Sequence, residues 1–110
     1  MNEKLIQAVS QNNIEDTKEL LKKGADINFI EIETKMTPLL IAVSNFYLDM
    51  AELLLENGAN PNPDSNRVYT LPLNEAIDSA VQMTLYDESI ENYPIEMIEL
   101  LLKYKADILI

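Results

Sequence analysis

The oxygen-bearing side chains between positions 60 and 66 are the ones best suited to hold a cation. They occupy alternate positions, as at the start of a calcium-binding loop: Asn60, Asn62, Asp64 and Asn66. Such a loop requires glycine at its sixth position and glutamate at its twelfth, where this chain has Ser65 and Leu71. Two prolines also stiffen the segment. We therefore interpret it as a linker turn and expect no metal site.

Neighbouring carboxylates are the other arrangement with catalytic potential, because two of them can act as general acid and base. The candidates are Asp87, Glu88 and Glu91, in a run that is typical of solvated surface. The chain has no histidine or cysteine, which excludes a Ser-His-Asp triad and a thiol–imidazole pair. Its two glycines are too few for a phosphate-binding loop. We expect no catalysis and no cofactor.

The charge balance limits the class of partner. The 110 residues include 19 acidic and 8 basic side chains, which gives a net charge of −11. Nucleic-acid affinity comes mainly from lysine and arginine at phosphates, so we expect no nucleic-acid partner. The acidic excess is localised, because residues 24–102 contain 14 acids against Lys35 and Arg67, whereas residues 1–23 are balanced. This distribution favours a protein partner with a basic surface.

Nothing in the sequence indicates a membrane or a secretory route. No apolar run approaches the roughly 18 residues that a membrane-spanning helix needs. The first residues lack the apolar core of a signal peptide, and the chain contains no cysteine. We therefore expect a cytoplasmic protein that does not bind membranes.

The chain repeats itself, and the repeat defines the elements on which any site must be built. At an offset of 34 residues, Ala-Val-Ser occurs at positions 8 and 42, and Gly-Ala at positions 24 and 58. A run of three leucines at 53–55 recurs at 100–102, an offset of 47. The longer offset predicts an insertion of 13 residues between Ile77 and Ile95.

Each repeat has the pattern of two short helices followed by an extended linker. Thr37 suits a helix N-cap and Pro38 the first helical position. Apolar residues follow at helical spacing, a tight turn is expected near Asn45, and Gly58 suits the left-handed residue that ends the second helix. About a dozen residues rich in Asn, Pro and Asp then predict an extended turn. The pattern indicates an all-α protein.

These motifs resemble the ankyrin repeat family. Thr37-Pro38-Leu39 with Ala42 is similar to the family's T-P-L-H-x-A, and 53–55 with Gly58-Ala59-Asn60 matches the end of its second helix. The tetratricopeptide repeat has a similar period but lacks the long linker. The resemblance implies a solenoid of stacked helix-turn-helix units joined by extended β-turn-like linkers. We expect one domain, 1–110, with repeats at about 3–36, 37–70 and 71–110. The family's inter-helix glycine is replaced by Asn12 and by Phe46, and Phe46 adopts a left-handed conformation less readily.

The resemblance implies a protein-interaction module that binds through its linker tips and the inner face formed by the first helices. Carried over by repeat offset, the expected contact positions are Ser10, Gln11, Glu33, Thr34, Met36, Ser44, Asn45, Val68, Tyr69, Asp78 and Ser79. Tyr69 is the strongest candidate, because tyrosine offers rigid amphipathic contact area. The alternative is an acidic inhibitor or immunity-type protein that neutralises a basic target such as a nuclease toxin.

The insertion, within about 78–94, departs most from the family. Apolar residues keep helical spacing through it and predict a first helix that continues to about Tyr86. A loop would follow over 87–93, and Pro94 would restart the second helix. Tyr86, Asp87 and Glu88 either contact a partner or, for the aromatic residue, pack beneath a capping loop.

The two ends of the stack differ in polarity. Asp16 and Glu19 occupy positions that are apolar in the later repeats, so repeat one resembles a polar N-terminal cap. Repeat three has Met97 and Leu100 at these positions, and nothing polar closes its outer face. We expect that face to be covered by the C-terminal tail, by the insertion, by a second copy through self-association, or by further chain.

Overall fold

The computed structural model describes residues 1–86 and 95–106, with side chains described for 1–80 and 95–106. These ranges form helices and contain no strand. The helices are α1 (Asn2–Ser10), α2 (Ile14–Lys22), α3 (Pro38–Ser44), α4 (Leu48–Glu56), α5 (Pro72–Tyr86) and α6 (Ile95–Lys103). The all-α prediction is confirmed.

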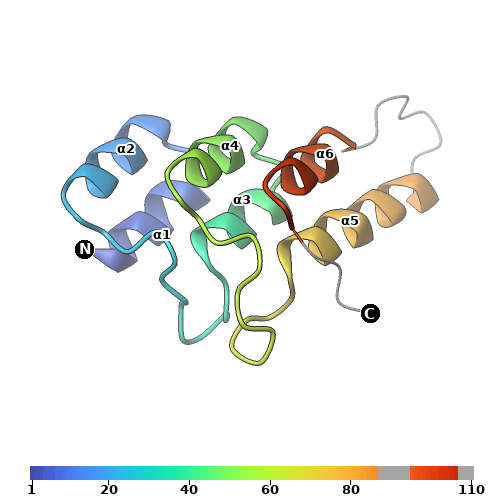
Figure 1. The fold of residues 1–110 in the computed structure, drawn as a ribbon, viewed down its shortest axis with the longest axis horizontal. Coiled ribbons are helices and arrows are strands. Elements are labelled where there is room, and N and C mark those ends of the chain that lie inside the picture. The colour runs from blue at the N-terminus through green and yellow to red at the C-terminus, as the bar shows by residue number, and fades with distance from the viewer. Residues whose placement is uncertain (87–94, 107–110) are drawn as a thin grey trace.

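The helices stack as pairs into a solenoid. Figure 1 shows α1, α3 and α5 in one row, α2, α4 and α6 in a second row, and the linkers projecting to one side. Within each pair the two helices pack together, and α3 packs on both α1 and α5. In the second row, α4 packs on α6. This arrangement confirms the predicted stack of helix-turn-helix units with extended linkers.

The predicted helix starts are present. The Thr37 side chain accepts a hydrogen bond from Leu40 N at 3.1 Å, and Pro38 follows as the first residue of α3. Thr37 is 5% exposed, so this bond satisfies a buried hydroxyl as well as a free helix N–H. At the start of α2, Asn13 accepts from Asp16 N at 3.0 Å. Side-chain caps therefore determine where these helices begin.

In repeats one and two, the turn between the two helices passes through a left-handed residue. Asn12 has φ of 55° and Phe46 has φ of 60°. The chain then reverses direction. Asn13 N donates to Ala8 O at 2.8 Å, and Tyr47 N donates to Ala42 O at 2.9 Å. Both substitutes for the family's glycine thus adopt its conformation, although Phe46 does so at a steric cost.

The second helix of each repeat also ends in a left-handed residue. Gly24 and Gly58 have φ of 98° and 94°, as the sequence predicted. In repeat three the equivalent position is Lys105, with φ of 66°. The alanine that follows is buried in all three repeats: Ala25, Ala59 and Ala106. The N–H of each alanine donates a hydrogen bond to a leucine carbonyl of the preceding helix at 2.9–3.0 Å. The same turn therefore forms with or without glycine.

One apolar core runs through the stack. It is formed by equivalent positions of successive repeats, and its fully buried leucines include Leu5, Leu39 and Leu73 in the first helices and Leu54 and Leu101 in the second helices. Because these positions recur, every repeat contributes one layer to the same core. The layers are continuous only if the helices stay in register.

The long helix predicted for repeat three is present, since α5 continues to Tyr86. The second helix resumes at Ile95, immediately after Pro94. The expected loop at 87–93, Pro94 itself and the apolar tail at 108–110 lie outside the described residues.

The left-handed turns predict opposite effects for two substitutions. Nothing lies within 4 Å of a Cβ placed on Gly58, so Gly58→Ala costs only backbone energy, about 1 kcal/mol in the free energy of unfolding. Lys105→Gly should increase stability by about the same amount, because it removes a side chain from a left-handed position. Urea unfolding measures both changes. A Lys105→Gly protein less stable than the wild type would contradict the role given to this turn.

Candidate functional site

The tip of the first linker is a tight turn closed by its own hydrogen bonds. Lys35 N donates to Glu31 O at 2.8 Å, and Glu31 N donates to Met36 O at 3.0 Å. The Thr34 hydroxyl donates to Glu31 Oε1 at 2.7 Å. Lys35 has φ of 58°, which allows the chain to reverse. The polar groups of this tip therefore hold its shape, and Glu33 remains exposed at its end.

The two linkers are joined to one another. Tyr69 N donates to Lys35 O at 2.8 Å. Two large apolar side chains stand out from this joined region, since Tyr69 is 71% exposed and Ile32 is 87% exposed. The sequence predicted Tyr69 but missed Ile32, which lies between two glutamates at the tip and could have been found from that position.

A small apolar cluster supports the linkers from below. It consists of Leu40, Val68 and Leu71, with Ile30 and Met36 packed against it. Val68 is only 5% exposed, so its predicted place at an accessible tip is wrong: the side chain turns inward while its neighbour Tyr69 points out. Met36, also predicted as a contact residue, is half-buried in this cluster. The cluster anchors both tips to α3.

Polar residues lie at the carboxyl ends of α1 and α3 and midway along the longer α5. Four of the predicted positions are exposed, namely Ser10, Gln11, Asn45 and Asp78. Ser44 and Ser79 are half-buried. The Ser44 hydroxyl donates to Glu75 Oε1 at 3.1 Å, a link between repeats two and three that sequence reasoning did not identify. The side chain of Tyr86, and all of Asp87 and Glu88, lie outside the described residues.

The alternating Asn and Asp residues form a hydrogen-bonded ladder between linkers. The Asn2 side chain accepts from Asp26 N at 2.9 Å, and Asn28 Oδ1 accepts from Asn60 N at 2.8 Å. Asn62 Nδ2 donates to Lys105 O at 3.0 Å. Asn28 and Asn62 are equivalent residues, and each bonds to the following repeat, whereas the Asn2 bond closes repeat one on itself.

The same residue types also close local turns. Asp26 Oδ1 accepts from Asn28 N at 2.9 Å, Asn60 Oδ1 from Asn62 N at 2.9 Å, and Asp64 Oδ1 from Asn66 N at 3.0 Å. Their side-chain oxygens are thus used by backbone N–H groups. Within the described residues, no group of three or more acidic side chains is placed to hold a metal ion.

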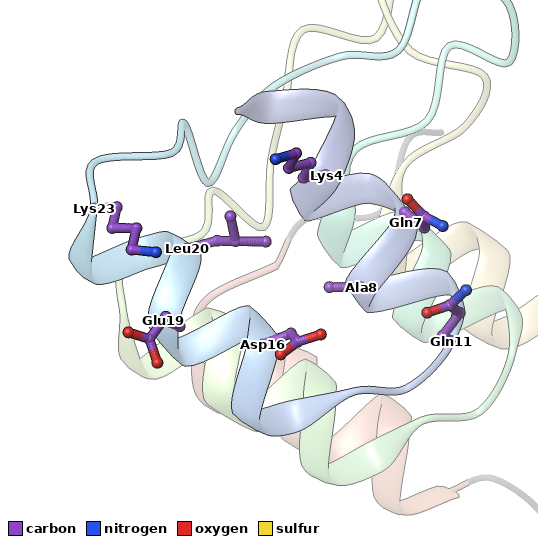
Figure 2. A pocket seen from close by; sticks show the side chains of 8 residues that line it. All are labelled: Lys4, Gln7, Ala8, Gln11, Asp16, Glu19, Leu20 and Lys23. Carbon is purple, nitrogen blue, oxygen red and sulfur yellow. The ribbon is translucent and has the colours of Figure 1, made fainter.

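A hollow with a volume of about 330 Å³ lies at the N-terminal end of the stack. Figure 2 shows its lining, with side chains from α1 on one side and α2 on the other. Ala8 and Leu20 form the apolar part, and the remaining lining residues are polar: Lys4, Gln7, Gln11, Asp16, Glu19 and Lys23. Asp16 and Glu19 are exposed, whereas Met97, at a position equivalent to Asp16, is 2% exposed. This end of the stack is polar, as the sequence predicted.

No acidic side chain of residues 24–80 or 95–102 forms an ion pair with another described residue. Over residues 1–86 and 95–106, the one ion pair is that of the N-terminal amine with Glu3, at 3.8 Å and on the surface. Acidic side chains are exposed at the linkers and on both rows of helices: Asp26, Glu33, Asp49, Glu56, Asp64, Asp78, Glu96 and Glu99. The negative charge is therefore available to a partner.

Comparison with known proteins identifies the family. A family model described as ankyrin repeats, in three copies, matches residues 5–110. The chain belongs to the ankyrin repeat family. The helix pairs of the three repeats, with the inter-helix turns and projecting linkers of repeats one and two, are thus those of ankyrin repeats, and the resemblance inferred from sequence is confirmed.

Related ankyrin repeat proteins match almost the whole chain. The protein FPV031 of Fowlpox virus is 34% identical over 129 aligned residues, which cover 97% of this chain and 38% of that protein. An ankyrin repeat protein of Rickettsia bellii is 34% identical over 91% of this chain and 46% of its own length. The chain therefore spans less than half the length of these relatives.

A solved ankyrin repeat domain has the same architecture. The crystal structure of the Bcl-3 ankyrin domain superimposes with a TM-score of 0.73 and 30% sequence identity. The match covers 94% of this chain and 39% of the Bcl-3 chain. Ankyrin repeats generally act as non-catalytic protein–protein interaction modules.

Among the described residues, no helix of this ankyrin chain combines the length and apolar character needed to cross a bilayer.

The inter-repeat ladder predicts a specific loss of stability. Asn28→Ala removes the acceptor for Asn60 N and should lower the free energy of unfolding by about 1 kcal/mol. Asn66→Ala is the matched control, because it removes an exposed linker asparagine whose recorded hydrogen bond is made by the backbone. Denaturant unfolding of both variants tests the difference. Equal losses would show that the ladder does not couple the repeats.

Proposed function

We propose that this ankyrin chain binds a protein partner through one surface, which comprises the linker tips and the exposed side of α1, α3 and α5. The exposed pair Ile32 and Tyr69 is the observation that supports this most directly. Apolar side chains that become buried on binding and are surrounded by polar groups are typical of the energetic centre of protein interfaces. The two side chains are exposed on linkers held in a fixed relation by the Tyr69–Lys35 backbone bond.

Rigidity favours binding through these tips. A loop that must be ordered on association loses conformational entropy and therefore affinity. Here the tip is closed by the Glu31–Met36 and Lys35–Glu31 bonds, and its base is anchored by Val68 and Leu71. The proposed surface continues along the first helices with exposed polar residues that suit its rim: Ser10, Gln11, Asn45 and Asp78.

We further propose that the partner surface is basic. The acids of residues 24–102 outnumber bases by 14 to 2, and those in the described ranges have no ion-pair partner. Such a charge speeds association with a cationic surface and selects against acidic partners.

Inhibition of a basic target such as a nuclease toxin is the second candidate function that this charge favours. A cytoplasmic location, consistent with the lack of cysteine, belongs to the same proposal.

Partner capture with paired baits tests the surface. The wild-type chain and an Ile32→Ala/Tyr69→Ala variant are used in parallel, and proteins are identified by mass spectrometry. Both side chains are more than two-thirds exposed, so the variant should keep the wild-type melting temperature. The specific partner is the protein retained by the wild type and lost by the variant. Equal recovery of every captured protein by both baits would contradict the proposed surface.

Tyr69→Ala alone should weaken binding to that partner by roughly tenfold or more, because tyrosine is among the residues that dominate interface energies. Isothermal titration calorimetry measures the change. Lys18→Ala, at an exposed position of α2 in the other row of helices, is the control and should leave the affinity unchanged. An unaltered affinity in Tyr69→Ala would remove this residue from the binding site.

A basic partner predicts that the association rate falls several-fold between about 50 mM and about 150 mM salt, since screening shortens the range of steering. Stopped-flow or surface plasmon resonance measures the rate. A Glu33→Lys/Asp78→Lys variant should have a weaker salt dependence, whereas Glu15→Lys on α2 changes the net charge by half as much and lies off the proposed surface. A rate independent of salt would exclude electrostatic steering and the basic partner with it.

A further inference from the structure

A groove lies between α2 and α4, which are neighbours in the second row of helices (Figure 1). It consists of two adjoining hollows, of about 310 and about 420 Å³, which share Lys18 and Leu53. The residues from each helix are at helical spacing and so lie on one side of that helix. From α2 they are Ile14, Lys18, Leu21 and Lys22, and from α4 they are Asp49, Glu52, Leu53, Glu56 and Asn57. We call this hollow surface the α2–α4 groove.

The α2–α4 groove lies where the second row of helices is packed least closely. The contact between α2 and α4 is less extensive than the contact between α4 and α6. Leu21 is therefore only half-buried, whereas Leu55, its equivalent in the next repeat, is 4% exposed. Further repeats would stack on the ends of the solenoid and would leave this side of α2 and α4 uncovered.

The two walls of the groove carry opposite charges. Lys18 and Lys22 are exposed on the α2 wall, one helical turn apart. Glu52 and Glu56 occupy the equivalent positions of α4, and Asp49 extends the acidic wall. None of these five side chains forms an ion pair with another described residue. Both walls can therefore pair with the charges of a ligand.

Between the walls, the groove has an apolar floor. It is formed by the half-buried side chains of Ile14, Leu21 and Leu53. Charge complementarity then specifies the segment that fits: apolar residues in the middle, acidic residues toward α2 and basic residues toward α4.

A helix is the conformation that suits this groove. Both walls are helices, whose backbone groups are bonded within the helix, so the groove has no strand edge to which an extended segment could bond. An extended segment would lose hydrogen bonds to water without replacing them, whereas a helix satisfies its own backbone. A helix also presents side chains at the four-residue spacing of Lys18 and Lys22.

The charge pattern distinguishes this groove from the next position along the row. In repeat two the equivalents of the two lysines are Glu52 and Glu56, and the facing helix α6 carries Glu96 and Glu99. Acidic residues thus lie on both helices there. A ligand with one acidic and one basic border matches the α2–α4 groove and would be repelled along its acidic border between α4 and α6.

We propose that the α2–α4 groove binds an amphipathic helix of a partner protein, whose apolar side is bordered by acidic residues along one edge and by basic residues along the other. This surface lies on the second row of helices, apart from the linker tips and the first row, and holds a different partner. Its apolar floor is small, so we expect a dissociation constant of about 10 µM or weaker.

NMR titration of the isotope-labelled chain with two designed helical peptides tests the groove. Both peptides have the same apolar side. The first has glutamate along one border and lysine along the other, and the second has lysine along both. At about 150 mM salt the first should bind about fivefold more tightly, because only it pairs with both walls. The net charge of −11 alone would favour the second peptide.

The chemical shifts locate the contact. The first peptide should move the amide signals of Lys18 and Leu53 and leave that of Tyr69 in place. A proline in the middle of this peptide breaks its helix and should abolish binding. Tighter binding of the all-lysine peptide, shifts confined to the linkers, or equal binding of the proline peptide would overturn the proposal.

Charge reversal on α2 tests the role of the two lysines. Lys18→Glu/Lys22→Glu makes both walls acidic and should reverse the preference, so that the all-lysine peptide binds more tightly. Lys4→Glu/Lys103→Glu, at exposed positions of α1 and α6, changes the net charge equally and should keep the wild-type preference. All four lysines are exposed, so the fold should be kept, and circular dichroism verifies this. The same peptide preference in both variants would contradict the proposed groove.

Discussion

The stacking of one repeat on the next is the interaction on which the rest of the structure depends. A pair of helices of seven to nine residues cannot bury both of its apolar sides within itself. Leu54 and Leu39 are fully buried because layers lie on both sides of them, and each such side chain stabilises the fold by roughly 2 kcal/mol. A shift in register would expose several of these residues together. The turns and linkers therefore have to hold each layer in a fixed position.

The linkers meet this requirement without using the residues proposed to bind a partner. Asn28 and Asn62 bond to the next repeat through side-chain amides, and Leu40 and Val68 form a second apolar cluster beneath the tips. The stabilising groups thus lie at the base and along the inner edges of the linkers. Ile32 and Tyr69 are free to vary because little of their surface contributes to folding. A repeat protein can in this way change its partner without changing its stack.

The sequence predicted the elements well because its signals were local and repeated. Thr37, Pro38 and Gly58 each mark a helix boundary by their own backbone chemistry, and the helical period of the insertion correctly extended α5 to Tyr86. Lys105 gave no such signal. It takes a left-handed conformation because its neighbour Ala106 is held in the core, which is a tertiary effect that no local rule contains.

The individual contact residues were harder to predict than the helices. In the linkers no period indicates which side chains face inward, so the sequence predicts both Val68 and Tyr69 as contact residues although one is buried and the other exposed. The direction of each depends on Leu40 and Leu71, which meet Val68 only after the repeats have stacked. Ile32 was overlooked for the same reason, because its exposure follows from the shape of a turn closed by Glu31, Lys35 and Met36.

The stacking constraint also explains why charge can accumulate on this chain without disturbing its fold. Side chains that face the neighbouring repeat must be apolar, whereas those facing away meet only water, so Glu56 or Asp78 adds charge at little cost. The exception is the end of the stack. There the side that would face a neighbour becomes surface, and its composition is subject to solubility instead of packing. At the α2 end this side carries Asp16 and Glu19, whereas the equivalent residues of α6, Met97 and Leu100, are buried or half-buried because α6 packs on α4. The composition of a face therefore follows from whether another repeat packs on it, and not from the helix that presents it.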